Sequence, residues 1–259
     1  MKPKNTLTKI IAVLIFVLLP QFLFAELDSQ TQEKAFSIME KTDDVLAYHG
    51  DYSATLSLVI DKPGKPQESV QYKIFQRTDS KLMTIVQLFP EAEKGNGYLR
   101  QEDNIWAYDP VGRKFTHTSL KEILGNSDIS LDDLDQTEYQ WRVNYKVSDF
   151  KEGTLGKFPV YIITLDAITS KPAYVKTTYY VRKDLNLILK QEDFSGSGRL
   201  MRTMLMPKYT KVPSGYVPTQ TILRDELNKG ENTQQTISEL TFDKLPDMIF
   251  TKAYLEGLN

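Results

Sequence analysis

Apolar and polar residues alternate with a period of two along most of this 259-residue chain, and this pattern constrains the fold more than any other feature. The clearest run is Trp141, Val143, Tyr145 and Val147, whose neighbours from Gln140 to Ser148 are all polar. Because successive strand residues point to opposite faces of a sheet, such a run predicts a strand over 138–149 with one dry face and one wet face. This alternation is typical of antiparallel sheets that are covered on one side.

Similar patterns predict about ten or eleven strands once adjoining segments merge. The connections are short and carry turn residues, as in Ser195-Gly196-Ser197-Gly198, so neighbouring strands should pair as hairpins. A sheet this long must curl or close to manage its edges, and a half-closed barrel can leave a cavity for a lipid-sized ligand. The candidate segments are 51–61, 68–77, 81–89, 97–101, 104–109, 114–118, 138–149, 157–166, 173–183, 186–194, 199–206, 216–225 and 233–242.

One segment breaks the alternation, because residues 82–89 are apolar on both faces of the expected strand. Such a strand lies between two covering layers or faces a ligand. The methionines Met201, Met204 and Met206 would suit an adaptable apolar surface, although filling of the core is the commoner role of methionine.

Helical spacing precedes the strands. Ala35, Ile38, Met39, Thr42, Val45 and Leu46 recur at that spacing, and Ser29 followed by Gln32 forms a capping-box pattern. A helix over about 29–47 is therefore expected to cover one face of the sheet. We also expect one or two helical turns over 118–124, and a capped C-terminal turn or helix after Pro246 that docks on the sheet.

The first 25 residues have the pattern of a signal peptide. Lys2, Lys4 and Lys9 give a basic start, and an almost uninterrupted apolar run follows up to Ala25. Cleavage after Ala25 would leave 26–259 as a single domain in the periplasm, while an uncleaved anchor is the alternative. Because the chain has no cysteine, it lacks the residue that is acylated in lipoproteins, so the mature protein should be free rather than membrane-anchored.

Composition also excludes several classes of chemistry. Without cysteine, and with only His49 and His117, disulfide frameworks, thiolate zinc sites, cysteine nucleophiles and three-histidine metal sites are impossible. A net charge of -2 argues against nucleic-acid binding. No G-x-S-x-G, H-E-x-x-H or P-loop motif occurs, so we expect neither an enzyme nor a cofactor. The aspartates at 128, 132, 133 and 135 lack the glycine and terminal glutamate of an EF-hand, and we interpret them as helix-initiating residues on a wet surface rather than a metal site.

Three motifs in order carry a resemblance to a known family. They are Trp106-Ala107-Tyr108-Asp109-Pro110, the segment 124–134, and the paired stretches 181–189 and 193–196. Together they resemble the outer-membrane lipoprotein-sorting family, the LolA-like proteins, in an uncharacterised subfamily. The resemblance implies a mainly β fold with helices (α+β), an unclosed antiparallel β-barrel lidded by the N-terminal helix and short helical turns, and a hydrophobic cavity that receives acyl chains.

Candidate site residues follow from this interpretation. The resemblance also implies that Arg77, at a strand end, latches the lid by bonding its carbonyl groups, although a solvated hairpin arginine is the alternative. For Trp106 and Tyr108 the alternative is that they are core aromatics beside a turn. The residues expected to line the cavity are Leu56, Leu58, Ile60, Ile74, Ile85, Trp106, Tyr108 and Trp141.

Two functions of different class are consistent with these observations. The first is a monomeric periplasmic carrier of lipoprotein acyl chains or other lipid to the outer membrane, which an inner-membrane exporter would load and an outer-membrane acceptor would unload. The second is a structural or interaction protein of the envelope that has the same fold without lipid cargo.

Overall fold

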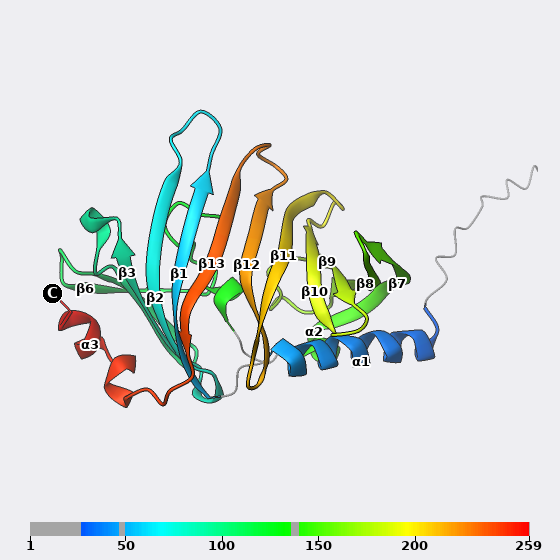
Figure 1. Cartoon of the computed structure of the whole chain (residues 1–259), viewed down its shortest axis with the longest axis horizontal. Coiled ribbons are helices and arrows are strands. Elements are labelled where there is room, and N and C mark those ends of the chain that lie inside the picture. The colour runs from blue at the N-terminus through cyan, green and yellow to red at the C-terminus, as the bar shows by residue number, and fades with distance from the viewer. Residues whose placement is uncertain (1–26, 47–49, 136–139, 259) are drawn as a thin grey trace, which may run out of the picture.

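A single antiparallel sheet organises the chain in the computed structural model, which describes residues 27–46, 50–135 and 140–258 (Figure 1). Thirteen strands within these ranges pair in the order β6-β5-β4-β3-β2-β1-β13-β12-β11-β10-β9-β8-β7. Each strand is antiparallel to the next, as in the pairing of β1 with β13, which joins the two halves of the sheet. The strands are β1 (Asp51–Asp61), β2 (Glu68–Arg77), β3 (Leu82–Phe89), β4 (Gly97–Gln101), β5 (Asn104–Asp109), β6 (Lys114–Thr118), β7 (Tyr145–Leu155), β8 (Phe158–Ala167), β9 (Lys176–Arg182), β10 (Leu187–Phe194), β11 (Leu200–Val212), β12 (Gly215–Asp225) and β13 (Asn232–Thr241).

The sheet is mainly β and unclosed, with β6 and β7 at its two edges. The number of strands is higher than expected because none of the candidate segments merge. β11 is longer than predicted, since it continues through Pro207 to Val212. A change of register between Leu205 and Lys208 accommodates the proline, which cannot donate to a regular ladder.

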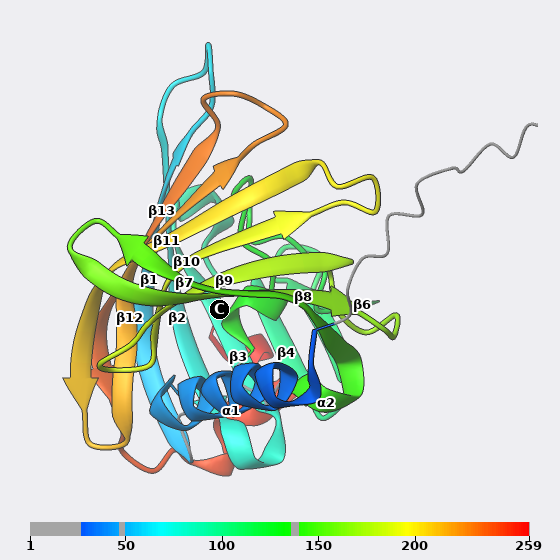
Figure 2. The same cartoon turned by 90° about the vertical axis from the view of Figure 1, so that its right-hand side faces the viewer.

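Helical segments lie against both faces of the curled sheet (Figure 2). α1 (Ser29–Leu46) runs beneath the arch of strands and contacts β7, β10, β12 and the short α2 (Trp141–Asn144). The predicted helix is thus confirmed, but its cap is one residue earlier than expected. The Thr31 amide donates to Asp28 Oδ1 at 3.0 Å, so Asp28 is the N-cap residue in place of Ser29.

At the other end of the chain, η4 (Asp247–Phe250) and α3 (Lys252–Glu256) dock on β3 and β4 as predicted. Thr251 caps α3 by accepting the Tyr254 amide at 3.2 Å. Leu255 from α3 is fully buried. The described residues include no helix long and apolar enough to cross a membrane.

The core falls into two clusters on opposite faces of the sheet. Ile85 belongs to the large cluster beneath α1, whereas its neighbour Val86 belongs to a small cluster with Leu99, Tyr108 and Leu255. Consecutive strand residues point to opposite faces, so β3 is buried on both sides. The expectation of a strand that is dry on both faces is confirmed for β3, whose second covering layer is α3.

Two local predictions are wrong. The strand expected over 138–149 begins only at Tyr145, because Gln140 has a left-handed backbone and residues 141–144 form the helical turn α2. Residues 118–124 form no helical turn. Instead β6 ends at Thr118 and Ile123 makes an isolated bridge with Ser130.

Candidate ligand cavity

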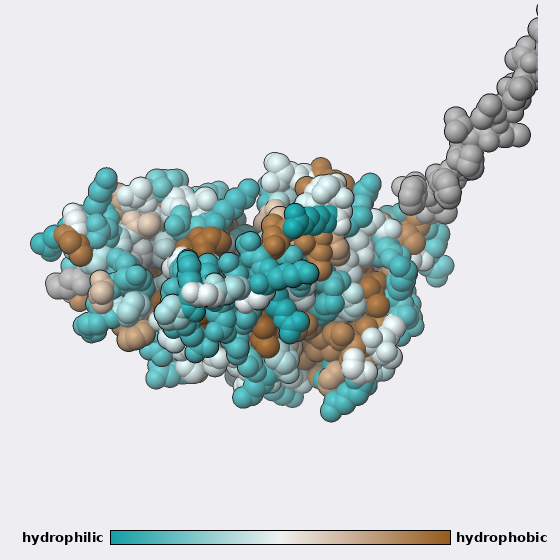
Figure 3. All heavy atoms as spheres, turned by 90° about the horizontal axis from the view of Figure 1, so that it is seen from above, coloured by the Kyte–Doolittle hydropathy of each residue, from teal (hydrophilic) through white to brown (hydrophobic). Residues whose placement is uncertain are grey.

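A cavity of about 180 Å³ lies between the sheet and α1, and it is the best candidate for a functional site. Strands from β1 to β13 on both sides of the central pair contribute its walls. α1 contributes Asp43 and Leu46, α2 contributes Trp141, and the 3-10 turn η3 (Asp132–Leu134) closes one end. Outside this space, the surface seen from above is largely hydrophilic with separate hydrophobic patches (Figure 3).

Most of the cavity wall is apolar. Met204 and Met206 alternate along β11 on the face that points inward, and Ile188 lies on the adjacent strand β10. Methionine adapts its shape at low cost, so this wall could fit chains of different conformation. The remaining apolar or aromatic wall residues are Leu46, Tyr52, Ala54, Ile74, Leu134, Trp141, Tyr145, Ala173, Tyr174, Tyr179, Tyr209, Val217, Pro218, Ile237 and Leu240.

Buried charges occupy one end of the cavity. Arg202 on β11 donates from Nε to Asp193 at 2.8 Å and from Nη1 to Asp133 at 2.9 Å. Asp193 is fully buried and also accepts the Thr177 hydroxyl at 2.9 Å. Burial alone would lower the pKa of Arg202, but the charges of Asp133 and Asp193 raise it well above its ordinary value, so this residue stays a cation.

The neighbouring Asp132 differs from the other carboxyls. Burial, followed by the negative charges of Asp133 and Asp135, raises the pKa of Asp132 above its ordinary value. Within the part of the chain that the structure describes, the Asp132 carboxyl accepts no hydrogen bond, whereas Asp133 and Asp135 are each paired with an arginine.

The expectation that this acidic run lies on a wet surface is therefore wrong. Asp135 is paired with Arg100 at 2.7 Å, and both side chains are more than nine-tenths buried. The partners Arg100 and Arg202 lie on strands distant in the sequence, so no local pattern announces the burial.

Contacts at the surface hold α1 in place over the cavity. Arg142 of α2 forms bidentate pairs with Glu33, at 2.7 and 2.8 Å, and with Glu40, at 2.5 and 3.1 Å. Asp43 accepts the Trp141 Nε1 hydrogen at 2.5 Å. These contacts join α1 to the short turn α2.

The C-terminal end of α1 has little free space beside it. Gly215 has a backbone φ of 150°, which disfavours other residues, and a Cβ atom there would lie 2.1 Å from the Val45 carbonyl oxygen. The turn between β11 and β12 thus packs directly against the last turn of α1.

The eight residues expected to line the cavity divide into three groups. Ile74 and Trp141 line it. Leu56, Leu58, Ile60 and Ile85 are buried in the large core cluster and contribute no part of the wall. Trp106 and Tyr108 pack in the small cluster beneath α3, which is their alternative interpretation as core aromatics beside a turn.

Arg77 makes contacts of the expected kind with a different partner. Its Nη2 donates to the Leu245 carbonyl at 2.6 Å, and its Nε and Nη2 donate to the Asp51 carboxylate at 2.7 and 3.0 Å. A further bond of 2.7 Å joins its Nη1 to Asp247. Arg77 therefore holds the C-terminal segment rather than α1. The hydrogen bonds with Arg77 lower the pKa of Asp51 below its ordinary value.

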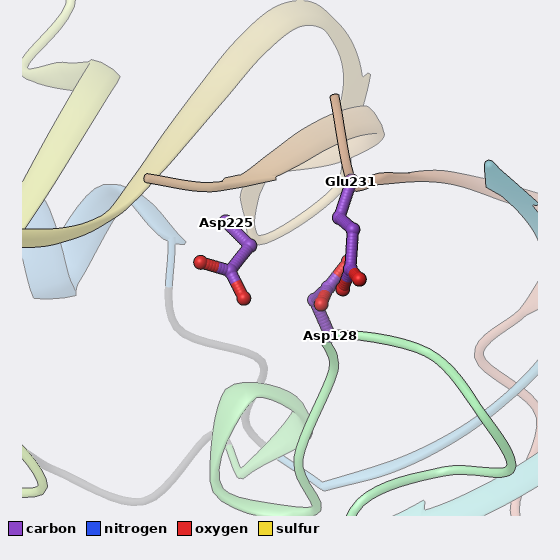
Figure 4. Close-up of side chains that lie close together, drawn as sticks. All are labelled: Asp128, Asp225 and Glu231. Atoms are coloured by element: carbon purple, nitrogen blue, oxygen red, sulfur yellow. The ribbon is translucent and has the colours of Figure 1, made fainter. Parts of the chain in front are cut away.

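A second group of carboxylates lies between the loop at Asp128 and the turn after β12 (Figure 4). Oxygen atoms of Asp128, Asp225 and Glu231 lie within 4.8 Å of one another. Asp128 already accepts the Thr233 hydroxyl at 2.8 Å, and Asp225 accepts the Leu227 and Asn228 amides at 2.6 and 3.0 Å. Hydrogen bonds within the protein account for this arrangement, and we assign no metal to it.

Comparison with known proteins identifies relatives of this fold. A family model described only as an uncharacterized protein matches residues 79–257. A LolA superfamily protein from Nitrosomonas europaea is 22% identical, with a TM-score of 0.71 over 85% of this chain and 98% of its own. An outer membrane lipoprotein-sorting protein domain from Vibrio parahaemolyticus is 18% identical, with a TM-score of 0.75 over 87% of this chain and 99% of its own.

A DUF1329 family protein from Desulfovibrio piger is 20% identical, with a TM-score of 0.76 over 87% of this chain and 99% of its own. Among curated proteins, no relative matches the sequence. At these identities the similarity to the solved structures establishes the fold, which includes both the sheet and the face where the cavity lies.

Proposed function

Because this chain belongs to the DUF1329-like family of uncharacterised proteins and has the fold of the LolA superfamily, we propose that it is a carrier of acyl chains. The chains would come from lipoproteins or other lipids and would be bound beneath α1. Delivery would run through the periplasm to the outer membrane, from an inner-membrane exporter to an outer-membrane acceptor. The signal peptide on which this location depends lies in residues 1–25, outside the described residues.

The observation that carries the proposal is the apolar cavity under α1. Each methylene group buried there would contribute about 0.8 kcal/mol, so binding needs no chemistry beyond removal of the chain from water. Met204, Met206 and Ile188 offer such a wall on two adjacent strands. Catalytic motifs are lacking in the sequence, and the mechanism proposed here requires none.

The size of the cavity indicates that the structure is the closed form of such a carrier. Its volume of about 180 Å³ is below the roughly 300–1,000 Å³ of typical ligand sites, so a whole acyl chain would not fit. Loading would then require α1 to move away from the sheet. α1 is suited to such a movement, because exposed ion pairs of Arg142 with Glu33 and Glu40 fix its outer face.

Native mass spectrometry of protein purified from its own envelope tests the proposal. The wild type should carry acyl chains, and the variant Ala54→Phe, which fills the wall at a fully enclosed position, should carry far less. Met204→Lys should lose the cargo as well, because a lysine ammonium would lie in the apolar wall. Met248→Lys is the matched control, since Met248 is 65% exposed and lies outside the cavity.

Two outcomes would contradict the carrier function. One is a wild type that copurifies with no lipid and takes up no added long-chain probe. The other is Ala54→Phe that is folded by circular dichroism and still carries the full load. Either result would favour the envelope scaffold, in which the space under α1 has no ligand.

A further inference from the structure

The charges at the end of the cavity bear on which headgroup could accompany an acyl chain. Among the described residues that line the cavity, Asp43, Asp132, Asp133 and Asp193 are acidic, and Arg202 is the single basic residue. Tyr145 and Tyr174 also face this end, and neither brings a positive charge. The formal balance is thus strongly negative, in a region where charges are poorly screened by water.

The arginine has little capacity left for an anionic headgroup. Its Nε and Nη1 donate to Asp193 and Asp133, and its guanidinium lies 5.0 Å from the centre of the Tyr174 ring. A phosphate or carboxylate placed there would have to compete with two carboxylates that already bind the same group. Like charges at this distance would disfavour its entry.

Asp132 presents the opposite case, because its carboxyl lines the cavity and accepts no hydrogen bond from the described residues. It lies beside Asp133 and Asp135 in the sequence, so an added positive charge would be attracted by several carboxylates at once. An ammonium group offers three N–H donors, which matches an acceptor without donors.

The position of these charges relative to the apolar wall fits an amphiphile. Arg202, Met204 and Met206 are spaced two residues apart on β11, and all three line the cavity. The charged end and the methionine wall are therefore neighbours along one strand. A headgroup held beside Asp132 and Arg202 would place its chain along Met204 and Met206.

We propose that the cavity selects amphiphiles whose headgroup carries a protonated amine, with the ammonium bound to Asp132 at the charged end and the chain along β11. This inference rests on the proposed function, because it assumes that an acyl or alkyl chain enters the cavity. It adds the chemical class of the headgroup and the residue that recognises it.

Binding of three probes of equal chain length tests it. They are a straight-chain primary amine, the corresponding alcohol and the corresponding carboxylic acid, each titrated by calorimetry at neutral pH below its micelle concentration. The full-length mature protein should bind the amine at least about tenfold more tightly than the acid, with the alcohol between them.

The variant Asp132→Asn removes the charge and keeps the shape of the side chain. It should bring the amine to about the affinity of the alcohol and leave the alcohol unchanged. Asp103→Asn is the matched control, because the Asp103 carboxylate is 92% exposed in the turn between β4 and β5 and lies outside the cavity. This control should keep the full preference for the amine.

The outcomes separate the two proposals. If all three probes bind equally, or the acid binds best, the headgroup inference is overturned and the carrier function stands. If Asp132→Asn keeps the preference for the amine, Asp132 is not the recognising residue and the inference is again overturned. If none of the probes binds the wild type, both proposals fail.

Discussion

The two helical segments cover opposite faces of one sheet, and they do so by different physical means. α3 places Leu255 in a dense apolar cluster, where a Cβ atom on Gly97 would lie only 2.8 Å from a Leu255 methyl group. α1 instead spans a cavity of about 180 Å³, and its outer face is joined to α2 by exposed ion pairs. The α3 side therefore has no room for a ligand, and the α1 side has some.

The arginines on the two sides show the same contrast. Arg77 bonds Asp51, a side chain that is 9% exposed, together with the Leu245 carbonyl of the C-terminal segment. Arg142 bonds Glu33 and Glu40, whose side chains are 66% and 46% exposed. Exposed pairs are weak and screened by salt, whereas the loss of a partner from a buried carboxylate is costly. We infer that α3 is a fixed part of the fold and that α1 is the movable segment.

Truncation of Leu255 should have the largest effect on this comparison. Leu255→Ala removes a fully buried side chain from a well-packed cluster, so the free energy of unfolding should fall by about 2–5 kcal/mol. Urea denaturation followed by circular dichroism measures this change. Leu258→Ala is the control, because Leu258 is 43% exposed and should matter little. If both variants are equally stable, α3 is not the fixed segment.

Loss of the Arg77 contacts should have an intermediate effect. Arg77→Gln leaves the Asp51 carboxylate and the Leu245 carbonyl without their donor, so the free energy of unfolding at neutral pH should fall by about 1–3 kcal/mol. The matched control is Arg182→Gln, which breaks a pair with the exposed Asp184 and should change stability little.

The pH dependence of the same variant gives a second measurement. Because Arg77 lowers the pKa of Asp51 in the folded state, this carboxylate stabilises the fold above its ordinary pKa. That contribution is lost as the pH falls through the lowered value. The wild type should therefore lose stability on acidification below about pH 4, and Arg77→Gln should lose less. Parallel acid profiles for the two proteins would contradict this role of Arg77.

The comparison also shows which parts of the fold the sequence could predict. Period-two alternation is a local property, so the bounds of β1 and β5 are predicted correctly and the helix over 29–46 is found by its spacing. The pattern fails at Trp141 and Val143, because four residues of alternating polarity fit a single helical turn as well as a strand. Contacts with α1, such as the bond from Trp141 to Asp43, accompany the helical turn.

The candidate site was harder to predict, for two physical reasons. Strand residues that are apolar at every position, as in β3, do not reveal which face meets the cavity and which meets α3, so Trp106 and Tyr108 were expected on the wrong side of the sheet. Buried charges such as Asp193 and Arg202 resemble surface residues until their partners are known. Met204 and Met206 could be found, because methionines spaced two apart in a strand indicate an adaptable wall.

The smallest expected effect concerns the attachment of α1. Arg142→Gln removes two bidentate pairs with Glu33 and Glu40, and these exposed contacts should add little to global stability. The change should instead appear as faster amide hydrogen exchange within residues 29–46, because local opening of α1 would then cost less.

Salt dependence identifies the physical cause of that opening. In the wild type, exchange in α1 should accelerate as the ionic strength rises, because the screening length shortens from about 10 Å at 0.1 M to about 3 Å at 1 M. In Arg142→Gln this response should be reduced, while exchange in α3 should be insensitive to salt in both proteins, because Leu255 is held by apolar packing. If α3 opens as readily as α1, or if exchange in α1 is unchanged by the substitution, then ion pairs do not govern access to the cavity, and a movable α1 would have to be abandoned as the route by which a chain enters.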